Sequence, residues 1–197
     1  MPLHNQTEPC DVVAIVGSAG GIAAMGEVLE RLPPDLPAAV VIVLHLTAQH
    51  KSLLAQILSR RTGLAVREAR DGDLLTESVV YVAPPDAHLL VTPDGEVRLD
   101  KSELVHHVRP SADVLLLSLA RDYPGRCLAV VLSGTGIDGA AGAAAVKQAG
   151  GHVVAQNEST SQHFGMPGAA ILAGGVDEVL ALEEIGRAVI DFTAVGA

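Results

Sequence analysis

Aromatic residues are almost absent from this sequence. Its 197 residues include two tyrosines, two phenylalanines and no tryptophan. The core must therefore be built from valine, leucine, isoleucine and alanine, the residues that fill the buried parallel sheets of α/β proteins. Hydrophobic residues make up 49% of the chain and charged residues only 18%. This composition indicates a globular protein, long enough for one domain with a sizeable core.

The sequence also has few cysteines, few basic residues and no long apolar run. Cys10 and Cys127 form no metal-binding pattern, so we expect two reduced thiols in a cytoplasmic protein. With 13 basic and 23 acidic residues the formal net charge is −10, which argues against a nucleic-acid partner. The longest apolar run, residues 38–44, is too short to span a bilayer, and residues 1–9 lack the core of a signal peptide. We therefore expect no membrane insertion.

Strand-like and helix-like segments alternate along the chain. Apolar runs predict strands at residues 12–16, 38–44, 65–69, 79–83, 127–132, 152–155 and 176–180. The segments between and after them predict helices at residues 22–32, 52–61, 111–121, 140–148, 167–172 and 182–192. The turn sequence Thr92-Pro-Asp-Gly95 predicts a β-hairpin in the middle of this alternation. The pattern favours an α/β fold: a doubly wound, mostly parallel sheet with helices on both faces and an inserted β-hairpin. We expect a tail at residues 1–11 and a single domain at residues 12–194.

Three of the predicted strands end in polar side chains, namely Ser18, His45 and Asp138. Parallel strands share one carboxyl edge, so these side chains could converge there. A serine, a histidine and an aspartate supply a nucleophile, its base and the orienter of that base. Each residue also has a purely structural interpretation. Ser18 could be a turn serine or a phosphate-loop hydroxyl, His45 could bond to backbone, and Asp138 could be the N-cap of the helix beginning near Gly139.

Several well-known motifs are absent. An α/β-hydrolase requires G-x-S-x-G, but Val16 occupies the first position of that motif. The glycines near Ser18 do not have the spacing of a dinucleotide-binding fingerprint, and no P-loop lysine follows them. His4 and the pair His106-His107 lack metal-ligand spacing. We therefore expect no metal and no organic cofactor.

Six segments together resemble the catalytic domain of bacterial chemotaxis-receptor methylesterases. They are Val16-Gly-Ser-Ala-Gly-Gly21, Leu44-His45, Val80-Tyr-Val-Ala-Pro-Pro-Asp-Ala-His88, Arg109-Pro-Ser-Ala-Asp113, Leu132-Ser-Gly-Thr-Gly-Ile-Asp-Gly139, and Gln156 with Phe164-Gly-Met-Pro167. They occur in the family's order and cover about residues 12–192. The resemblance implies an α/β fold with a largely parallel sheet.

The same resemblance implies an activity and its residues. Ser18, His45 and Asp138 would form a catalytic triad that hydrolyses glutamyl methyl esters on the cytoplasmic helices of chemoreceptors and releases methanol. Deamidation of receptor glutamines is a second implied activity. Backbone N–H groups near Thr135 and Ala19 would bind the oxyanion. Arg109 would contact the substrate.

The sequence departs from the family in three ways. Ala19 stands where the family usually has threonine, and Thr135 stands where it usually has methionine. The family commonly carries an N-terminal phosphoryl-receiver domain, whereas only the short tail precedes the first predicted strand. We therefore expect either a stand-alone form or a domain of a longer protein, controlled by a separate regulator or by domains outside this chain.

Two further interpretations stay open. In the first, the chain is a catalytically weak or inactive signalling module that binds a receptor or regulator. In the second, the first glycine-rich turn binds a nucleotide, which the missing fingerprint disfavours.

Overall fold

The computed structural model describes residues 10–45 and 53–195. Most of the predicted tail lies outside the described residues, as do His4 and the first residue of the helix predicted at 52–61.

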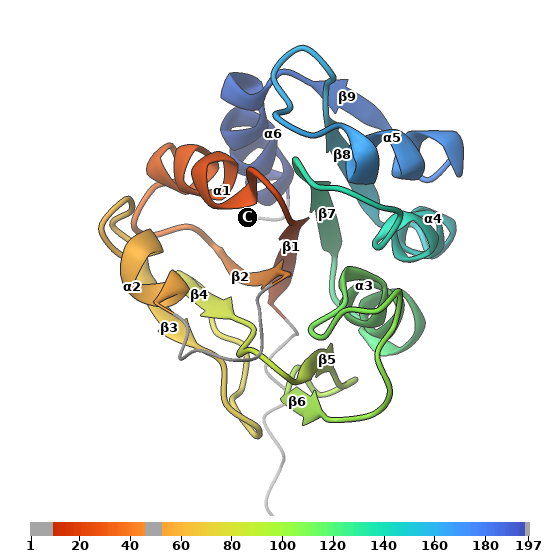
Figure 1. Ribbon diagram of the computed structural model, residues 1–197. Coiled ribbons are helices and arrows are strands. Elements are labelled where there is room, and N and C mark those ends of the chain that lie inside the picture. The colour runs from red at the N-terminus through yellow and green to blue at the C-terminus, as the bar shows by residue number, and fades with distance from the viewer. Residues whose placement is uncertain (1–9, 46–52, 196–197) are drawn as a thin grey trace, which may run out of the picture.

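Seven parallel strands form the central sheet of the described residues (Figure 1). They are β1 (Asp11–Gly17), β2 (Ala38–Leu44), β3 (Ala65–Glu68), β4 (Val79–Val82), β7 (Cys127–Val131), β8 (His152–Gln156) and β9 (Glu178–Leu180). Their spatial order is β3-β4-β2-β1-β7-β8-β9, and every neighbouring pair is parallel. The predicted fold class is confirmed.

Helices cover both faces of this sheet. One face packs against α1 (Gly21–Glu30), α2 (Leu54–Leu58) and α6 (Leu182–Ala194). The other packs against α3 (Ala112–Asp122), α4 (Ala140–Gln148) and α5 (Gly165–Leu172). The predicted hairpin is present on this second face as an antiparallel pair, β5 (His88–Val91) with β6 (Val97–Asp100).

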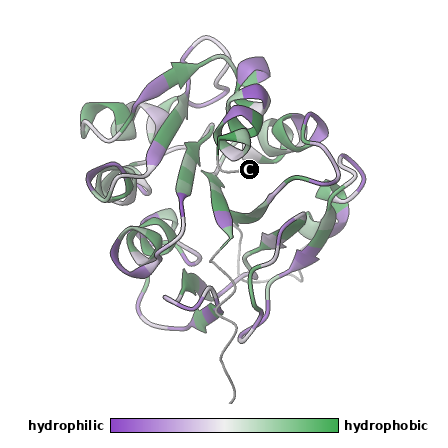
Figure 2. Ribbon diagram, turned by 180° about the vertical axis from the view of Figure 1, so that it is seen from behind, coloured by the Kyte–Doolittle hydropathy of each residue, from purple (hydrophilic) through white to green (hydrophobic). Residues whose placement is uncertain are grey.

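The residues of β1 explain why the sheet is buried on both sides. Val12, Ala14 and Val16 point into the core beneath α3 and α4, whereas Val13 and Ile15 point into the core beneath α1 and α6. All five are fully buried. A strand buried on both faces reads as a continuous apolar run, and the strands form the hydrophobic centre of Figure 2.

The winding of the chain reverses between β1 and β7. From β1 the chain passes through α1 to β2 on one side, and from β7 it passes through α4 to β8 on the other. Because α1 and α4 cover opposite faces, this reversal is the kind of position at which open parallel sheets bind their ligands, beyond the carboxyl ends of the strands. Ser18 follows β1, Asp138 lies in the loop after β7, and His45 follows β2.

Most predicted elements agree with the structure to within one or two residues. The helix α5 starts at Gly165, earlier than the predicted 167–172, because a proline in the first turn, here Pro167, loses no intrahelical hydrogen bond. The strand β9 is shorter than the predicted 176–180. None of the described helices has the length and apolar character needed to cross a bilayer.

Candidate active site

Ser18 lies on the turn between β1 and α1, and its backbone is held from both sides. Its N–H donates to the carbonyl of Ser133 at 3.0 Å, and its carbonyl accepts the N–H of Gly21 at 2.8 Å. Gly20 has φ of 78°, and a Cβ there would lie 2.7 Å from Ser133 Oγ. Only glycine fits this position. The shape of the turn is therefore set by the loop after β7.

Ser133 joins the two loops. Its hydroxyl donates to the carbonyl of Ala19 at 2.8 Å and accepts the N–H of His163 at 3.0 Å. Its own N–H donates to Oε1 of Gln156 at 2.9 Å. Ser133 and Gln156 are both almost fully buried, so these bonds form without competition from water. Gln156 thereby fixes the loop that runs beside Ser18.

His45 and Asp138 form a close pair at the edge of the sheet. His45 Nε2 lies 2.7 Å from Asp138 Oδ2, and the two side chains are 12% and 3% exposed. A carboxylate only accepts hydrogen bonds, so Nε2 carries the proton and Nδ1 is the nitrogen left for another partner. The structure brings these two residues together, while their catalytic roles stay predictions.

The Asp138 carboxylate caps the start of α3. Its Oδ1 accepts the Ser111 hydroxyl at 2.7 Å and the N–H of Asp113 at 3.1 Å, and its Oδ2 accepts the N–H of Ala112 at 2.6 Å. Burial alone would raise the pKa of Asp138. Hydrogen bonds from His45, Ser111 and the two backbone N–H groups outweigh burial and hold that pKa below its usual value. Asp138 is thus held as an anion at the positive end of a helix.

The interpretation of Asp138 as N-cap of its own following helix is wrong. The N-cap of α4 is Gly139, which has φ of 94° and no side chain with which to cap. Asp138 instead directs its carboxylate across to α3. The distinction matters because the carboxylate that touches His45 is fixed by a different part of the chain.

Ser18 and His45 line the same hollow, which has a volume of about 580 Å³. The other lining residues are small or aliphatic: Ala19, Gly20, Ile22, Ala23 and Leu44. Within residues 10–45 and 53–195, the Ser18 hydroxyl has no hydrogen-bond partner, so it is not bonded to His45. Catalytic hydrogen bonds often tighten only when substrate binds, so this geometry leaves a nucleophilic role open.

The residues predicted to bind an oxyanion flank Ser18. A Cβ on Gly134 would lie 3.0 Å from Ser18 Cβ and 2.3 Å from Met166 Sδ, so the loop after β7 approaches the serine as closely as glycine allows. The next residue, Thr135, is exposed. Among the described residues, the backbone N–H groups of Thr135 and Ala19 have no acceptor. Two N–H groups therefore remain available beside Ser18.

Arg109 makes its contacts within the chain. Its Nε donates to Asp86 Oδ1 at 3.1 Å, and its Nη1 donates to the carbonyls of Lys101 (3.0 Å) and Ser102. The guanidinium lowers the pKa of Asp86 through this hydrogen bond. These bonds hold the segment that leads into α3. A contact between Arg109 and substrate stays a prediction.

Sequence reasoning missed the support that Ser111 and His88 give to Asp138. Ser111 was predicted only as a helix cap; its hydroxyl does accept the N–H of Val114 at 3.4 Å, but it also donates to Asp138. His88 Nδ1 accepts the N–H of Ser111 at 3.2 Å, while its Nε2 donates to the carbonyl of Glu103 at 3.0 Å. The position of His88 within an apolar predicted strand was the available signal. The neighbouring sequence, however, does not indicate that its partner is Ser111, 23 residues further along the chain.

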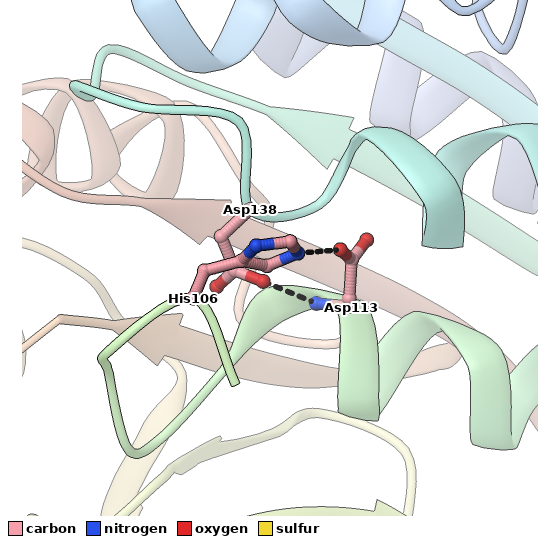
Figure 3. A group of neighbouring side chains, drawn as sticks. All are labelled: His106, Asp113 and Asp138. Carbon is pink, nitrogen blue, oxygen red and sulfur yellow. Dashed lines mark hydrogen bonds and ion pairs between the residues drawn. The ribbon is translucent and has the colours of Figure 1, made fainter. Parts of the chain in front are cut away.

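Asp138 also lies close to His106 and Asp113 (Figure 3). Their potential ligand atoms all fall within 4.8 Å of one another. However, each oxygen of Asp138 already accepts two hydrogen bonds, and Asp113 Oδ1 accepts the N–H of Gly142 at 2.7 Å. These oxygens are engaged by hydrogen-bond donors, so the group as it stands is built for helix capping rather than for holding a metal ion.

Comparison with known proteins agrees with this fold. A sequence model described as CheB methylesterase matches residues 13–189. The chain belongs to the CheB methylesterase family. The crystal structure of the Thermotoga maritima CheB methylesterase catalytic domain superimposes with a TM-score of 0.87 at 36% identity. That alignment covers 94% of this chain and all of the Thermotoga domain.

Two CheB-family relatives are similar in sequence over nearly the whole chain. Protein-glutamate methylesterase FrzG of Myxococcus xanthus is 39% identical over 95% of this chain and 56% of its own length. Protein-glutamate methylesterase/protein-glutamine glutaminase 2 of Anaeromyxobacter dehalogenans is 44% identical over 93% of this chain and 53% of its own length. The chain therefore spans about half the length of the curated relatives it matches.

Proposed function

We propose that this chain is a serine esterase domain that removes methyl esters from glutamate side chains of chemotaxis receptors and also deamidates receptor glutamines. The observation that carries the proposal is the 2.7 Å His45–Asp138 hydrogen bond at the carboxyl edge, with His45 and Ser18 in one hollow. Both relatives, which are about twice this length, are named protein-glutamate methylesterase, and the Anaeromyxobacter protein is also named protein-glutamine glutaminase, which supports the same assignment here.

The first step is attack of Ser18 Oγ on the ester carbonyl carbon. His45 Nδ1 takes the hydroxyl proton, because Nε2 already donates to Asp138. The Asp138 anion stabilises the imidazolium that forms. The carbonyl oxygen becomes an oxyanion and accepts the free N–H groups of Ala19 and Thr135.

Collapse of this intermediate breaks the ester bond. His45 returns the proton to the leaving methoxide, methanol departs, and the glutamyl group remains esterified to Ser18. Water then attacks with the same base, which frees the glutamate carboxylate and restores the Ser18 hydroxyl. A glutamine follows the same course with ammonia as the leaving group.

The lining of the hollow fits a neutral side chain. Among the described residues, its lining apart from Ser18 and His45 consists of small or aliphatic residues, with no acidic or basic side chain other than His45. A glutamyl methyl ester is uncharged, whereas the product is a carboxylate that an apolar surface solvates poorly. The net charge of −10 disfavours retention of that anion further. Product release is therefore favourable.

The decisive measurement is methanol release from methylated receptor membranes. Ser18→Ala should lower the rate by at least about 1,000-fold, since serine hydrolases lose this much or more without the nucleophile. The fold should persist, because alanine fits wherever the serine side chain fitted. A variant that hydrolyses the ester at close to the wild-type rate would remove Ser18 from the mechanism.

Ala19 favours one other function, a signalling module that binds a receptor or regulator without turnover. The residue replaces the threonine usual beside the family's serine, so the site lacks one hydroxyl. A fluorophosphonate separates the two functions. It should label wild-type protein and fail to label Ser18→Ala, whereas a folded wild-type protein that resists labelling would favour the binding module.

A further inference from the structure

The helices α3 and α4 exchange caps at their N-termini. Asp138, which precedes α4, accepts the N–H groups of Ala112 and Asp113 in α3. Asp113, in the first turn of α3, accepts the N–H of Gly142 in the first turn of α4 at 2.7 Å. Each helix start thus depends on a carboxylate from the other. Because the two carboxylates are linked through the backbone of Asp113, a shift of Asp113 displaces Asp138.

His106 holds the outer oxygen of Asp113. Its Nε2 donates to Asp113 Oδ2 at 3.0 Å, and the Asp113 side chain is only 5% exposed (Figure 3). A buried carboxylate oxygen without a donor is unfavourable, so this N–H stabilises the observed position of Asp113. The same histidine has a ring nitrogen within 4.8 Å of an Asp138 oxygen. His106 therefore lies directly behind the carboxylate that meets His45.

The turn that carries His106 has an unusual backbone. His106 and His107 have φ of 51° and 64°, and Val105 and Val108 close the turn with two reciprocal N–H···O=C bonds of 3.2 and 3.0 Å. Successive positive φ values are normally left to asparagine and glycine. Such conformations persist where the surrounding structure requires them. Here the turn delivers the His106 imidazole to Asp113, while His107 is exposed and has no hydrogen-bond partner in the described part of the chain.

We infer that His106 is a positioning residue for the Asp138–His45 pair. His106 acts by holding Asp113, which contacts the first turn of α4 and thereby fixes the starts of α3 and α4 relative to each other. Asp138 is held in turn by the start of α3. The inference deepens the proposed esterase function and rests on it for the rate measurement. It also makes a claim about the His45–Asp138 hydrogen bond that can be tested without any substrate.

The test compares His106→Ala with His107→Ala in the full chain. Both substitutions remove an imidazole from the same turn at a positive φ, so they carry similar backbone strain. For His106→Ala we expect a loss of about 10-fold or more in kcat, the scale seen when a supporting hydrogen bond behind a site is removed. KM should stay within about twofold, because substrate binding is untouched. His107→Ala should behave as wild type.

A spectroscopic measurement and a rescue variant complete the design. The proton on His45 Nε2, bonded to a carboxylate, should give a downfield NMR resonance in wild type and His107→Ala, and should broaden or move upfield in His106→Ala. His106→Gln places an amide N–H at a similar reach and should restore both kcat and the resonance. If His106→Ala does not fold, His106→Asn replaces it, because asparagine tolerates positive φ but its amide is too short to reach Asp113.

Equal rates and equal resonances for the two alanine variants would overturn the inference. So would a failure of His106→Gln to recover what the removal variant lost. If wild type itself hydrolyses no ester, the proposed function fails, and the His45 resonance alone then decides whether His106 positions the pair.

Discussion

At the scale of single residues, the Asp138 carboxylate serves two purposes. Its four accepted hydrogen bonds come from His45, from Ser111 and from two backbone N–H groups of α3. The hydrogen bond from His45 orients the imidazole, and the other three stabilise the start of α3. A substitution at this position therefore changes stability and chemistry together.

Asp138→Asn makes this double role measurable. An asparagine offers one carbonyl oxygen, and its NH₂ group would face N–H or O–H donors that now meet a carboxylate. We expect the free energy of unfolding to fall by about 1–3 kcal/mol, the usual consequence of unsatisfied buried donors. Ester hydrolysis should fall by at least about 100-fold, because the amide also favours the wrong tautomer of His45.

Urea unfolding and steady-state kinetics on the same preparation would test both effects. Ser111→Ala is the matched control: it removes one donor from Asp138 without adding a misdirected one, so its rate should fall much less. An Asp138→Asn protein that kept most of its activity would show that Asp138 is only a helix cap.

At the scale of elements, two helical glycines have opposite environments. A Cβ on Gly142 of α4 would lie 2.5 Å from Cβ of Leu116 on α3. A Cβ on Gly26 of α1 would lie no closer than 3.6 Å to any atom of the described residues outside its own helix. Alanine is a better helix former than glycine at both places. We expect Gly26→Ala to stabilise the protein by up to about 1 kcal/mol. Gly142→Ala should destabilise it by about 1–3 kcal/mol, because α3 and α4 must move apart.

Thermal unfolding of both variants, with esterase rates alongside, checks this pair. Separation of α3 from α4 also weakens the exchanged caps, so Gly142→Ala should lose activity while Gly26→Ala keeps it. A Gly142→Ala protein at least as stable as wild type would contradict the close packing of these helices.

The sequence predicted the elements well because their signals are local. Apolar runs end at Ser18 and His45 because each buried strand ends there, and the alternation of strands and helices then specifies a parallel sheet. The partners of Asp138 were not predictable in this way. They depend on α3 and α4 lying side by side, a long-range packing that hydrophobic periodicity does not encode. The sequence consequently indicated only a helix cap at Ser111 and only a lack of metal-ligand spacing at His106.

At the scale of the whole molecule, lowered carboxyl pKa values link stability to pH. An aspartate in an unfolded chain has a pKa of about 3.9. The pKa of Asp138 in the folded protein lies below that of the unfolded chain, so the unfolded chain binds the proton more readily. The stability that this lowered pKa contributes is fully present above the unfolded pKa, and it is lost as the pH falls through the pKa of Asp138 in the folded protein. Asp177 contributes in the same sense, whereas burial raises the pKa of Asp11 and gives the opposite sense.

We therefore expect the urea midpoint to decline as the pH drops below about 4. Asp138→Asn should show a shallower decline, because its amide does not titrate. Identical pH profiles for the two proteins would mean that Asp138 contributes nothing to this linkage.

The order of the site residues along the chain has a consequence for protein synthesis. His45 and its aspartate are separated by 93 residues, and β7 must pair with β1 before they can meet. A nascent chain still attached to the ribosome carries its serine and imidazole early but has no carboxylate to orient them. The proposed hydrolysis therefore requires translation to have passed Asp138 and β7 to have paired with β1.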